Sequence, residues 1–285
     1  MRAQLKPLSD ARFVQAESPR WDSRSDELIW VDHSTGRLHC GRFASGRLIP
    51  TRSYRVGKQI GFAAPSDSGG WIVAAGRDLI HVAENGALST LIQNALPEGH
   101  TFNDGGVDPK GRIWAGSQSL PRGPHCGLFS LDRDGQWVKR LDHATVSNGL
   151  AFSDDGYTLY YIDTLPHHSI DVFSVEEGGS LSHRRRLVVV EGGNPDGMCI
   201  DAAGNLWVAV WDAGEVRQYS PSGGLICTLK LAARRPTAVT IAGKLLVVTS
   251  ASVGLANPGP DDGAIFGIEL EVGAAEQSVL ARIHS

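Results

Sequence analysis

The sequence lacks long hydrophobic runs. Nowhere do about 18 uncharged apolar residues follow one another, which is the length that a membrane-spanning helix needs. The first residues, MRAQLKPLSDARF, also lack the continuous apolar core of a secretion signal. We therefore expect no membrane segment and a cytoplasmic protein.

Basic charge is also scarce. The chain carries 27 Lys and Arg against 31 Asp and Glu, for a net charge of −4. No stripe of Lys and Arg alternates with aromatic residues, as it would on a surface that binds a phosphate backbone. We therefore expect no nucleic-acid partner.

Cysteine is rare, and several catalytic motifs are missing. Cys40, Cys126, Cys199 and Cys227 are far apart and form no C-x-x-C pair, which favours reduced thiols over a disulfide framework or a structural zinc site. The sequence contains neither a G-x-S-x-G nucleophile elbow nor a Gly-rich phosphate loop. Acyl-enzyme chemistry at a serine and nucleotide binding are therefore unsupported.

Short apolar segments recur along the chain, and runs of helix-favouring residues are few. ELIWVD, GWIVAA, RIWAGS, TLYYID, NLWVAV and KLLVVT lie at successive spacings of 42, 42, 46, 47 and 39 residues, measured between their central residues. These central residues, called anchors below, are Trp30, Ile72, Trp114, Tyr160, Trp207 and Leu246. A period near 43 residues matches a four-stranded propeller blade. The sequence predicts an all-β, six-bladed propeller that occupies residues 1–285 as one domain.

The repeat also predicts details of each blade. Asp108, Asp154 and Asp201 each lie six residues before an anchor and are expected to open hairpin turns. A second strand-like stretch after each anchor is expected to form the third strand of its blade. The segment ARFVQAE, residues 11–17, is expected to pair into the last blade and close the ring.

Four acceptor side chains recur at a similar phase of the repeat. Glu17, Asn103, Asn148 and Asp196 lie 11 to 13 residues before the anchors of four different blades. That phase is the entry to the innermost strand, so the four should converge at one mouth of the central channel. Asn and Asp also begin strands simply as turn formers. If they do converge, two carboxylates and two amides make a hard oxygen site that suits calcium, magnesium or manganese.

At these residues the sequence resembles the gluconolactonase family, also known through regucalcin (senescence marker protein) and the luciferin-regenerating enzyme. The resemblance covers essentially the whole chain and rests on AESPRW, FNDGGVDPKGRIWAG, SNGLAFSDDGYTLYYIDT and PDGMCIDAAGNLWVA in this order. It implies one divalent cation in a central metal-binding channel, held by Glu17, Asn148 and Asp196, with Asn103 close to metal and substrate. Calcium is the first expectation, with zinc, manganese and magnesium as alternatives.

The resemblance also implies hydrolysis of a sugar lactone. The cation would polarise the lactone carbonyl, and a water activated by Asp196 would attack it; a water on the cation itself is the alternative. Asp104 is expected to orient the ligands. The animal members carry an Arg where this chain has Thr101, and a Glu where this chain has the segment SQSLPRG. Thr101 and Gln118 are therefore candidate substrate-binding residues, with His100 and Arg122 as further substitutes.

Other functions stay open on the sequence alone. The same cation could serve the hydrolysis of another ester or of an organophosphate, or the chain could be a non-catalytic calcium-binding propeller. His167 and His168 could touch substrate or lie in a solvated loop. Residues 117–126 and 252–262 are expected to form loops at the rim of the site. We expect a monomer or a weak homo-oligomer.

Overall fold

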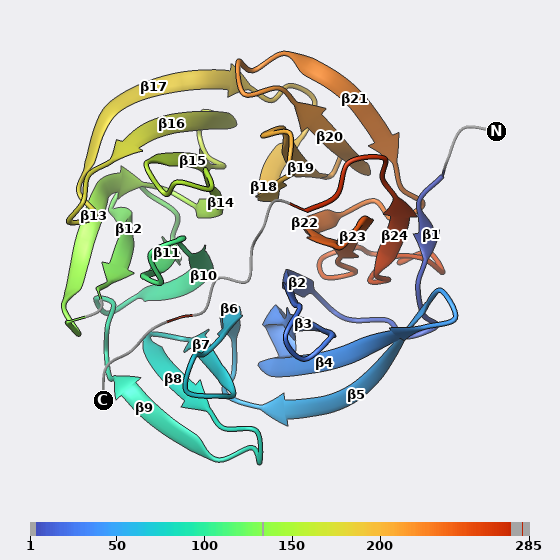
Figure 1. Cartoon of the computed structure of the whole chain (residues 1–285), viewed down its shortest axis with the longest axis horizontal. Helices are drawn as coiled ribbons and strands as arrows, with labels where there is room; N and C mark the ends of the chain where they lie inside the picture. Colours follow the sequence, from blue (N-terminus) through green and yellow to red (C-terminus); the bar gives the residue numbers. More distant parts are fainter. Residues whose placement is uncertain (1–3, 133, 275–280, 282–285) are drawn as a thin grey trace.

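Six four-stranded antiparallel sheets stand around a central axis, as Figure 1 shows. This computed structural model describes residues 4–132, 134–274 and 281. Within this part of the chain the only helical element is the short 3-10 turn η1 (His33–Thr35). The predicted all-β, six-bladed propeller is therefore confirmed.

The first five blades are each one continuous stretch of chain, in which successive strands pair with their neighbours. Blade 1 contains β2 (Ala16–Asp22), β3 (Glu27–Asp32), β4 (Arg37–Ala44) and β5 (Arg47–Arg55). Blade 2 contains β6 (Ile60–Pro65), β7 (Trp71–Ala75), β8 (Asp78–Val82) and β9 (Leu88–Ile92). Blade 3 contains β10 (His100–Val107), β11 (Ile113–Ser119), β12 (Cys126–Leu131) and β13 (Trp137–Ala144).

The same order continues around the ring. Blade 4 contains β14 (Ser147–Phe152), β15 (Thr158–Asp163), β16 (Ser169–Val175) and β17 (Leu181–Val189). Blade 5 contains β18 (Asn194–Ile200), β19 (Leu206–Trp211), β20 (Glu215–Tyr219) and β21 (Leu225–Lys230). Blade 6 contains β22 (Pro236–Ala242), β23 (Leu245–Ser250) and β24 (Phe266–Glu269), with β1 (Lys6–Pro7) as its outer strand.

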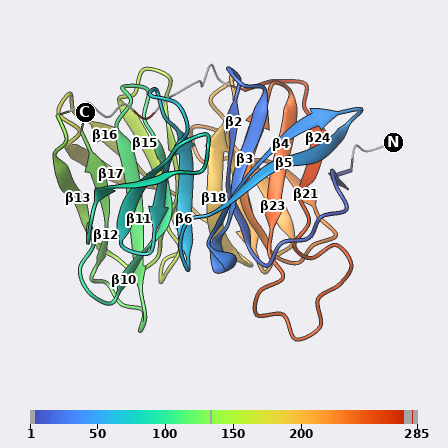
Figure 2. The same cartoon turned by 90° about the horizontal axis from the view of Figure 1, so that it is seen from below.

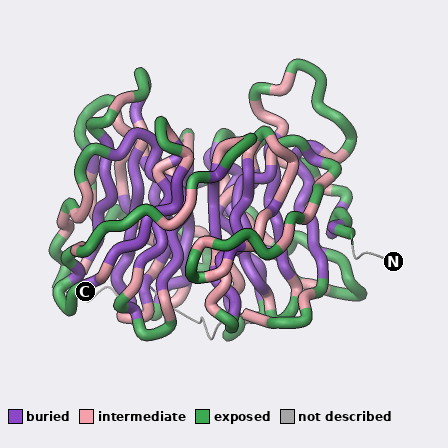
Figure 3. The backbone as a smooth tube through the Cα atoms, turned by 90° about the horizontal axis from the view of Figure 1, so that it is seen from above, coloured by how far each residue is buried: buried purple, intermediate pink, exposed green. Residues whose placement is uncertain are grey.

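The repeat read from the sequence corresponds to the second strand of each blade. All six anchors lie in second strands, and each strand-like stretch that follows an anchor forms the third strand. Large apolar side chains from neighbouring sheets fill the space between blades, so the inner strands are almost wholly buried while the outer strands are largely exposed (Figure 3). This burial explains why the inner three strands give a clear apolar signal and the fourth strands do not.

The expected closing strand is wrong in its position, although the start of the chain does close the ring. The strand that pairs with β24 is Lys6–Pro7, and the expected segment 11–17 instead crosses from blade 6 to blade 1. It contacts blade 6 through an isolated bridge between Gln15 and Ala251 and through backbone hydrogen bonds of Phe13 and Val14 to the loop between β23 and β24, and its end enters β2. Glu17 belongs to the innermost strand, which lies at the opposite edge of a blade from the closing strand.

Loops of unequal length emerge from the ring. The longest runs between β23 and β24 and projects from one end of the ring, in orange-red in Figure 2. Among the described residues no helix is long and apolar enough to cross a membrane.

Candidate functional site

A break in strand pairing recurs at the same place in all six innermost strands. In each, the register to the second strand shifts, as it does at a β-bulge. The shifts fall between Glu17 and Arg20, Ile60 and Phe62, Phe102 and Gly105, Ser147 and Leu150, Pro195 and Met198, and Pro236 and Val239. A bulge bends its strand and re-aims the side chains beside it.

Four of these breaks carry the acceptor side chains identified in the sequence. Asn103, Asn148 and Asp196 lie within the unpaired steps, and Glu17 is the last paired residue before one. All four line one cavity of about 570 Å³. Convergence at one mouth of the channel, which the common phase in the sequence indicates, is therefore what the fold produces.

Hydrogen bonds hold the acceptors in place. Asn148 Nδ2 donates to Thr164 Oγ1 over 3.0 Å, and that hydroxyl donates to the Pro195 carbonyl over 2.8 Å. Because the amide nitrogen of Asn148 is engaged in this way, its oxygen is left free as an acceptor. Gln15 Nε2 donates to Glu17 Oε1 over 3.3 Å, and Asn103 Nδ2 donates to the Ser147 carbonyl over 3.0 Å.

The cavity floor concentrates negative charge. Burial, the charge of Asp196 and that of Asp104 together raise the pKa of Glu17 well above its ordinary value. Burial and the charge of Asp104 likewise raise the pKa of Asp196, while a hydrogen bond with Asn148 opposes the shift. Among the described residues no Lys or Arg forms an ion pair with either carboxylate. Buried carboxylates without a basic partner are costly when charged.

The glycines that follow the acceptors allow neighbouring strands to approach each other closely. A glycine after Asn or Asp is typical of a turn, and the sequence alone would place these glycines on turns. Gly105, Gly149 and Gly197 instead lie inside strands, and none has a positive φ. A Cβ on Gly149 would lie 2.4 Å from the Asp196 carbonyl oxygen, and one on Gly197 would lie 2.4 Å from Ala238 Cβ. Glycine therefore lets neighbouring inner strands come together, and this brings the acceptors within reach of one another.

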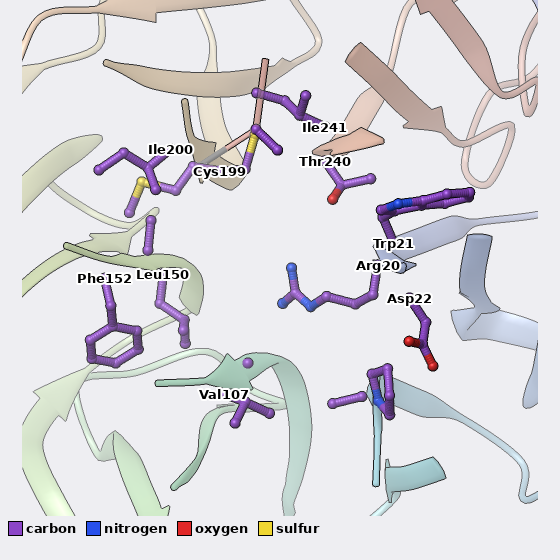
Figure 4. A pocket seen from close by; sticks show the side chains of 16 residues that line it. Arg20, Trp21, Asp22, Val107, Leu150, Phe152, Cys199, Ile200, Thr240 and Ile241 are labelled. Atoms are coloured by element: carbon purple, nitrogen blue, oxygen red, sulfur yellow. The ribbon is translucent and has the colours of Figure 1, made fainter. Parts of the chain in front are cut away.

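A second, smaller cavity of about 100 Å³ lies among the far ends of the inner strands. Figure 4 shows the Arg20 guanidinium projecting into it, across from Leu150. Arg20 Nη2 donates to the Gly105 carbonyl. Burial raises the pKa of Asp104, and the Arg20 charge opposes this rise. The channel thus carries acidic oxygens at one end and a guanidinium toward the other.

The other candidates from the sequence divide into two groups. Thr101, Gln118 and Arg122 line the larger cavity, whereas His100, His167 and His168 are not among its lining side chains. The two expected rim loops reach the cavity through Leu120 and Arg122 and through Val253.

Sequence reasoning missed several lining residues. Gln15 precedes Glu17 by two positions, and alternation along a strand could have found it. Other missed residues share phases of the repeat that the acceptor pattern leaves out. Thr164 and Trp211 lie four residues after their anchors, as Gln118 does, and Gln59 and Asn194 lie 13 residues before theirs, as Glu17 does.

Comparison with known proteins identifies the family of this chain. The sequence model described as SMP-30/Gluconolactonase/LRE-like region matches residues 15–252. The chain belongs to this family. A 6-deoxy-6-sulfogluconolactonase of Pseudomonas putida is 34% identical over 263 residues, covering 88% of each chain. Regucalcin of Danio rerio is 34% identical over 250 residues, covering 84% of this chain and 83% of the relative.

Solved structures share the fold at lower identity. A luciferin-regenerating enzyme superposes with a TM-score of 0.88 over 98% of this chain and 99% of its own, at 24% identity. A calcium-binding regucalcin from Agrobacterium tumefaciens gives 0.86 over 96% of each chain, at 23% identity. These likenesses extend the six-bladed ring to proteins whose sequences have diverged widely from this chain.

Proposed function

We propose that the protein hydrolyses a sugar lactone with the help of one divalent cation held by Glu17, Asn148 and Asp196. The observation that carries the proposal is the convergence of two carboxylates and an amide oxygen from three inner strands on one cavity. Among the described residues no Lys or Arg forms an ion pair with either carboxylate. Hard oxygen donors suit calcium first, and magnesium or manganese next. Family membership adds a named lactonase among the relatives.

The cavity wall suits a polyhydroxylated substrate. Its volume of about 570 Å³ falls within the usual range for small-molecule sites. Besides Asn148, five side-chain amides line it, and an amide can donate to and accept from hydroxyl groups: Gln15, Gln59, Gln118, Asn103 and Asn194. A lactone ring bearing hydroxyl groups would satisfy such a wall better than an apolar ester would.

The residues divide the chemistry between them. When bound, the cation would polarise the lactone carbonyl and stabilise the negative charge that develops on its oxygen. Asp196 would accept a proton from the attacking water, whose oxygen bonds to the carbonyl carbon. The bond from that carbon to the ring oxygen then breaks, and Asp196 would return the proton to this oxygen to give the hydroxy acid. Asn103 and Gln118 would orient the ring through its hydroxyl groups.

Arg122 points to a narrower substrate class. It lines the cavity, is exposed, and forms no ion pair among the described residues. A guanidinium at the rim suits a lactone with an anionic substituent, such as the sulfonate in the name of the Pseudomonas putida relative. We propose that anionic lactones are preferred and that Arg122→Gln lowers kcat/KM for them while sparing neutral lactones.

The experiment is a pH-drop assay on five- and six-carbon aldonolactones and a sulfonated six-carbon lactone. Chelator-stripped protein receives calcium, magnesium, manganese or zinc, and binding of each ion is measured separately by calorimetry. Asp196→Asn should lower kcat/KM by about a thousandfold or more, since the electrostatic contribution lost is several kcal/mol. The matched control is Asp212→Asn, a carboxylate that is 48% exposed beyond the end of β19.

Each outcome has a separate meaning. Hydrolysis that needs the cation and disappears only in Asp196→Asn supports the proposal. Tight cation binding without hydrolysis of any lactone would point to another ester or an organophosphate as substrate. Hydrolysis that survives Asp196→Asn at full rate would contradict the assignment of the site.

A further inference from the structure

Three soft donor side chains meet at one end of blade 3, outside the oxygen site. His100 begins β10, Cys126 begins β12, and His125 precedes Cys126 in the loop that follows β11. The ligating atoms of the three all lie within 4.8 Å of one another. The two imidazole rings lie with centroids 5.3 Å apart and planes inclined by 46°.

Burial and hydrogen bonding leave these donors available to a ligand. Cys126 is fully buried and is a free thiol. His100 Nδ1 is buried and has no hydrogen-bond partner among the described residues. His125 is exposed, and its Nε2 shares a hydrogen bond of 2.8 Å with Ser119 Oγ. A buried ring nitrogen without a partner costs free energy that a bound metal would offset.

We propose that His100, His125 and Cys126 form a second metal site, for a soft divalent ion of which zinc is the first candidate. One thiolate and two imidazoles are a donor set that zinc prefers, while the oxygen site around Asp196 suits hard cations. Ligand atoms around a tetrahedral zinc lie roughly 3.3–3.6 Å apart, from its bond lengths to nitrogen and sulfur. Separations of up to 4.8 Å exceed these spacings by at most about 1.5 Å, so binding requires only a small side-chain adjustment.

The sequence hides this site. The absence of a C-x-x-C pair argues against structural zinc, and His100 lies 25 residues before His125. Only the pairing of β11 with β10 and with β12 brings the start of β10 beside the start of β12.

The proposed metal site lies beside residues that line the large cavity, so a metal bound there would affect the rim of this cavity. The β10–β11 ladder pairs His100 with Ser119 and Thr101 with Gln118. The loop between β11 and β12 carries Leu120 and Arg122, both of which line the cavity. A metal that joins β10, this loop and β12 would fix Arg122 over the cavity. This consequence rests on the proposed lactonase function, whereas the metal site itself does not.

Cobalt(II) is the probe, because a thiolate bound to it gives a sulfur-to-metal charge-transfer absorption that oxygen ligands do not give. Titration of chelator-stripped, reduced wild-type protein should produce this band and saturate at one equivalent. His125→Ala should weaken binding at this site by more than about tenfold. Cys126→Ser should abolish the band, and zinc should displace the cobalt.

Two control variants separate this site from other thiols and from the oxygen site. Cys227→Ser removes a half-buried thiol of blade 5, and Asp196→Asn removes a proposed ligand of the oxygen site. Both should leave the cobalt band unchanged. A protein without lactonase activity that still shows the band would refute the proposed function and leave this site intact.

The inference would be overturned by absence of the band in the wild-type protein. It would also be overturned if His125→Ala bound cobalt with unchanged affinity, because the metal would then be bound without His125. His125 is exposed, so this variant tests the site even if replacing the buried Cys126 prevents folding. A band that is lost in Cys227→Ser would likewise assign the metal to a different thiol.

Discussion

Asp108 and Asp201 bind the turn and the anchor tryptophan in the same way at equivalent points of blades 3 and 5. Asp108 Oδ2 accepts the indole N–H of Trp114 over 3.0 Å, and Asp201 Oδ2 accepts that of Trp207 over 3.1 Å. The other oxygen of each accepts two backbone N–H groups of the hairpin turn. One carboxylate therefore fixes both the turn and the buried tryptophan of the second strand.

Asp108→Ala is expected to lower the free energy of unfolding by about 3–5 kcal/mol, because it leaves a buried cation without its partner. Arg112 Nε donates to Asp108 Oδ2 over 2.6 Å, and the side chains of both residues are almost fully buried. Urea unfolding followed by tryptophan fluorescence measures the change.

Asp154→Ala is the control, since Asp154 has the same spacing from its anchor, Tyr160, but is exposed, and Ser153 closes the hairpin of blade 4 in its place. Its effect should stay within about 0.5 kcal/mol. Equal losses in the two variants would show that the turn alone, and not the indole and guanidinium partners, accounts for the stability.

These aspartates also show which properties of a single residue can be predicted from the sequence. Their spacing predicts the hairpin turns correctly. The spacing does not distinguish the buried Asp108 from the exposed Asp154, because the hairpin of blade 4 is one residue longer. Ser153 makes its closing hydrogen bonds with Thr158, and Asp154 follows Ser153 in the turn. Likewise, nothing in the local pattern predicts that Arg20, in the innermost strand of blade 1, enters the channel.

The innermost strands determine the site through their bulges and their glycines. Gly149 lies in β14 directly after Asn148, where the backbone of β18 passes closest to it. The close approach fixes how near Asn148 and Asp196 come to one another. The distance between two proposed metal ligands therefore depends on a residue that is itself no ligand.

Gly149→Ala is expected to cost about 1–3 kcal/mol of stability, because its Cβ would lie 2.4 Å from the Asp196 carbonyl oxygen and push the strands apart. Affinity for the divalent cation should fall by about tenfold, as happens when groups that orient metal ligands are lost. Calorimetric titration with calcium measures the affinity, and thermal unfolding measures the stability.

Gly178→Ala provides the comparison, because Gly178 has negative or extended φ and a Cβ there would meet nothing within 4 Å. This variant should bind the cation as the wild type does. Wild-type affinity in Gly149→Ala would refute the view that strand approach sets the ligand spacing.

Convergence is predictable from the common phase in the repeat of Glu17, Asn103, Asn148 and Asp196. The bulges that aim these side chains are not predictable, because they leave no change in the spacing of apolar residues. The His100, His125 and Cys126 cluster is hidden for a different reason. It joins two strands and a loop whose side chains carry no shared period.

The stability of the whole molecule should depend on pH through two histidines. Burial lowers the pKa of His33 and of His39 to about 4, and the charge of Asp32 opposes both shifts. The same groups titrate near 6.5 when unfolded, so between pH 4 and 6.5 the unfolded chain binds more protons. Their contribution is complete above pH 6.5 and is lost as the pH falls toward 4.

His39→Phe isolates this effect. His39 stacks on Trp30 with ring centroids 5.4 Å apart, and its buried Nε2 has no partner among the described residues, so phenylalanine should keep the packing and lose no hydrogen bond. The fall in unfolding free energy from pH 7.5 to pH 5 should be smaller by about 2 kcal/mol than in the wild type. Identical pH profiles for the two proteins would contradict the burial of a neutral imidazole.

Ring closure should depend on the first residues of the described chain. Lys6 and Pro7 pair with Gly267 and Phe266, and Leu5 and Leu8 are buried beside them. Deleting residues 1–9 should cost about 3–6 kcal/mol from the two leucines alone and leave β24 as an uncovered edge. Thermal unfolding and sedimentation velocity over a range of concentrations should show a lower Tm and self-association. An unchanged monomer with unchanged Tm would rule out this role for β1.

Ring closure by β1 also determines the order in which the blades can be completed during synthesis on the ribosome. Blades 1 to 5 are continuous segments, so each can complete its four strands soon after it emerges. Blade 6 cannot, because its outer strand is made before blade 1 and its β24 after blade 5, so Pro7 and Phe266 pair across the five other blades. The nascent protein therefore waits as an open arc with two exposed blade faces. A chaperone that recognises those faces would act on this late intermediate.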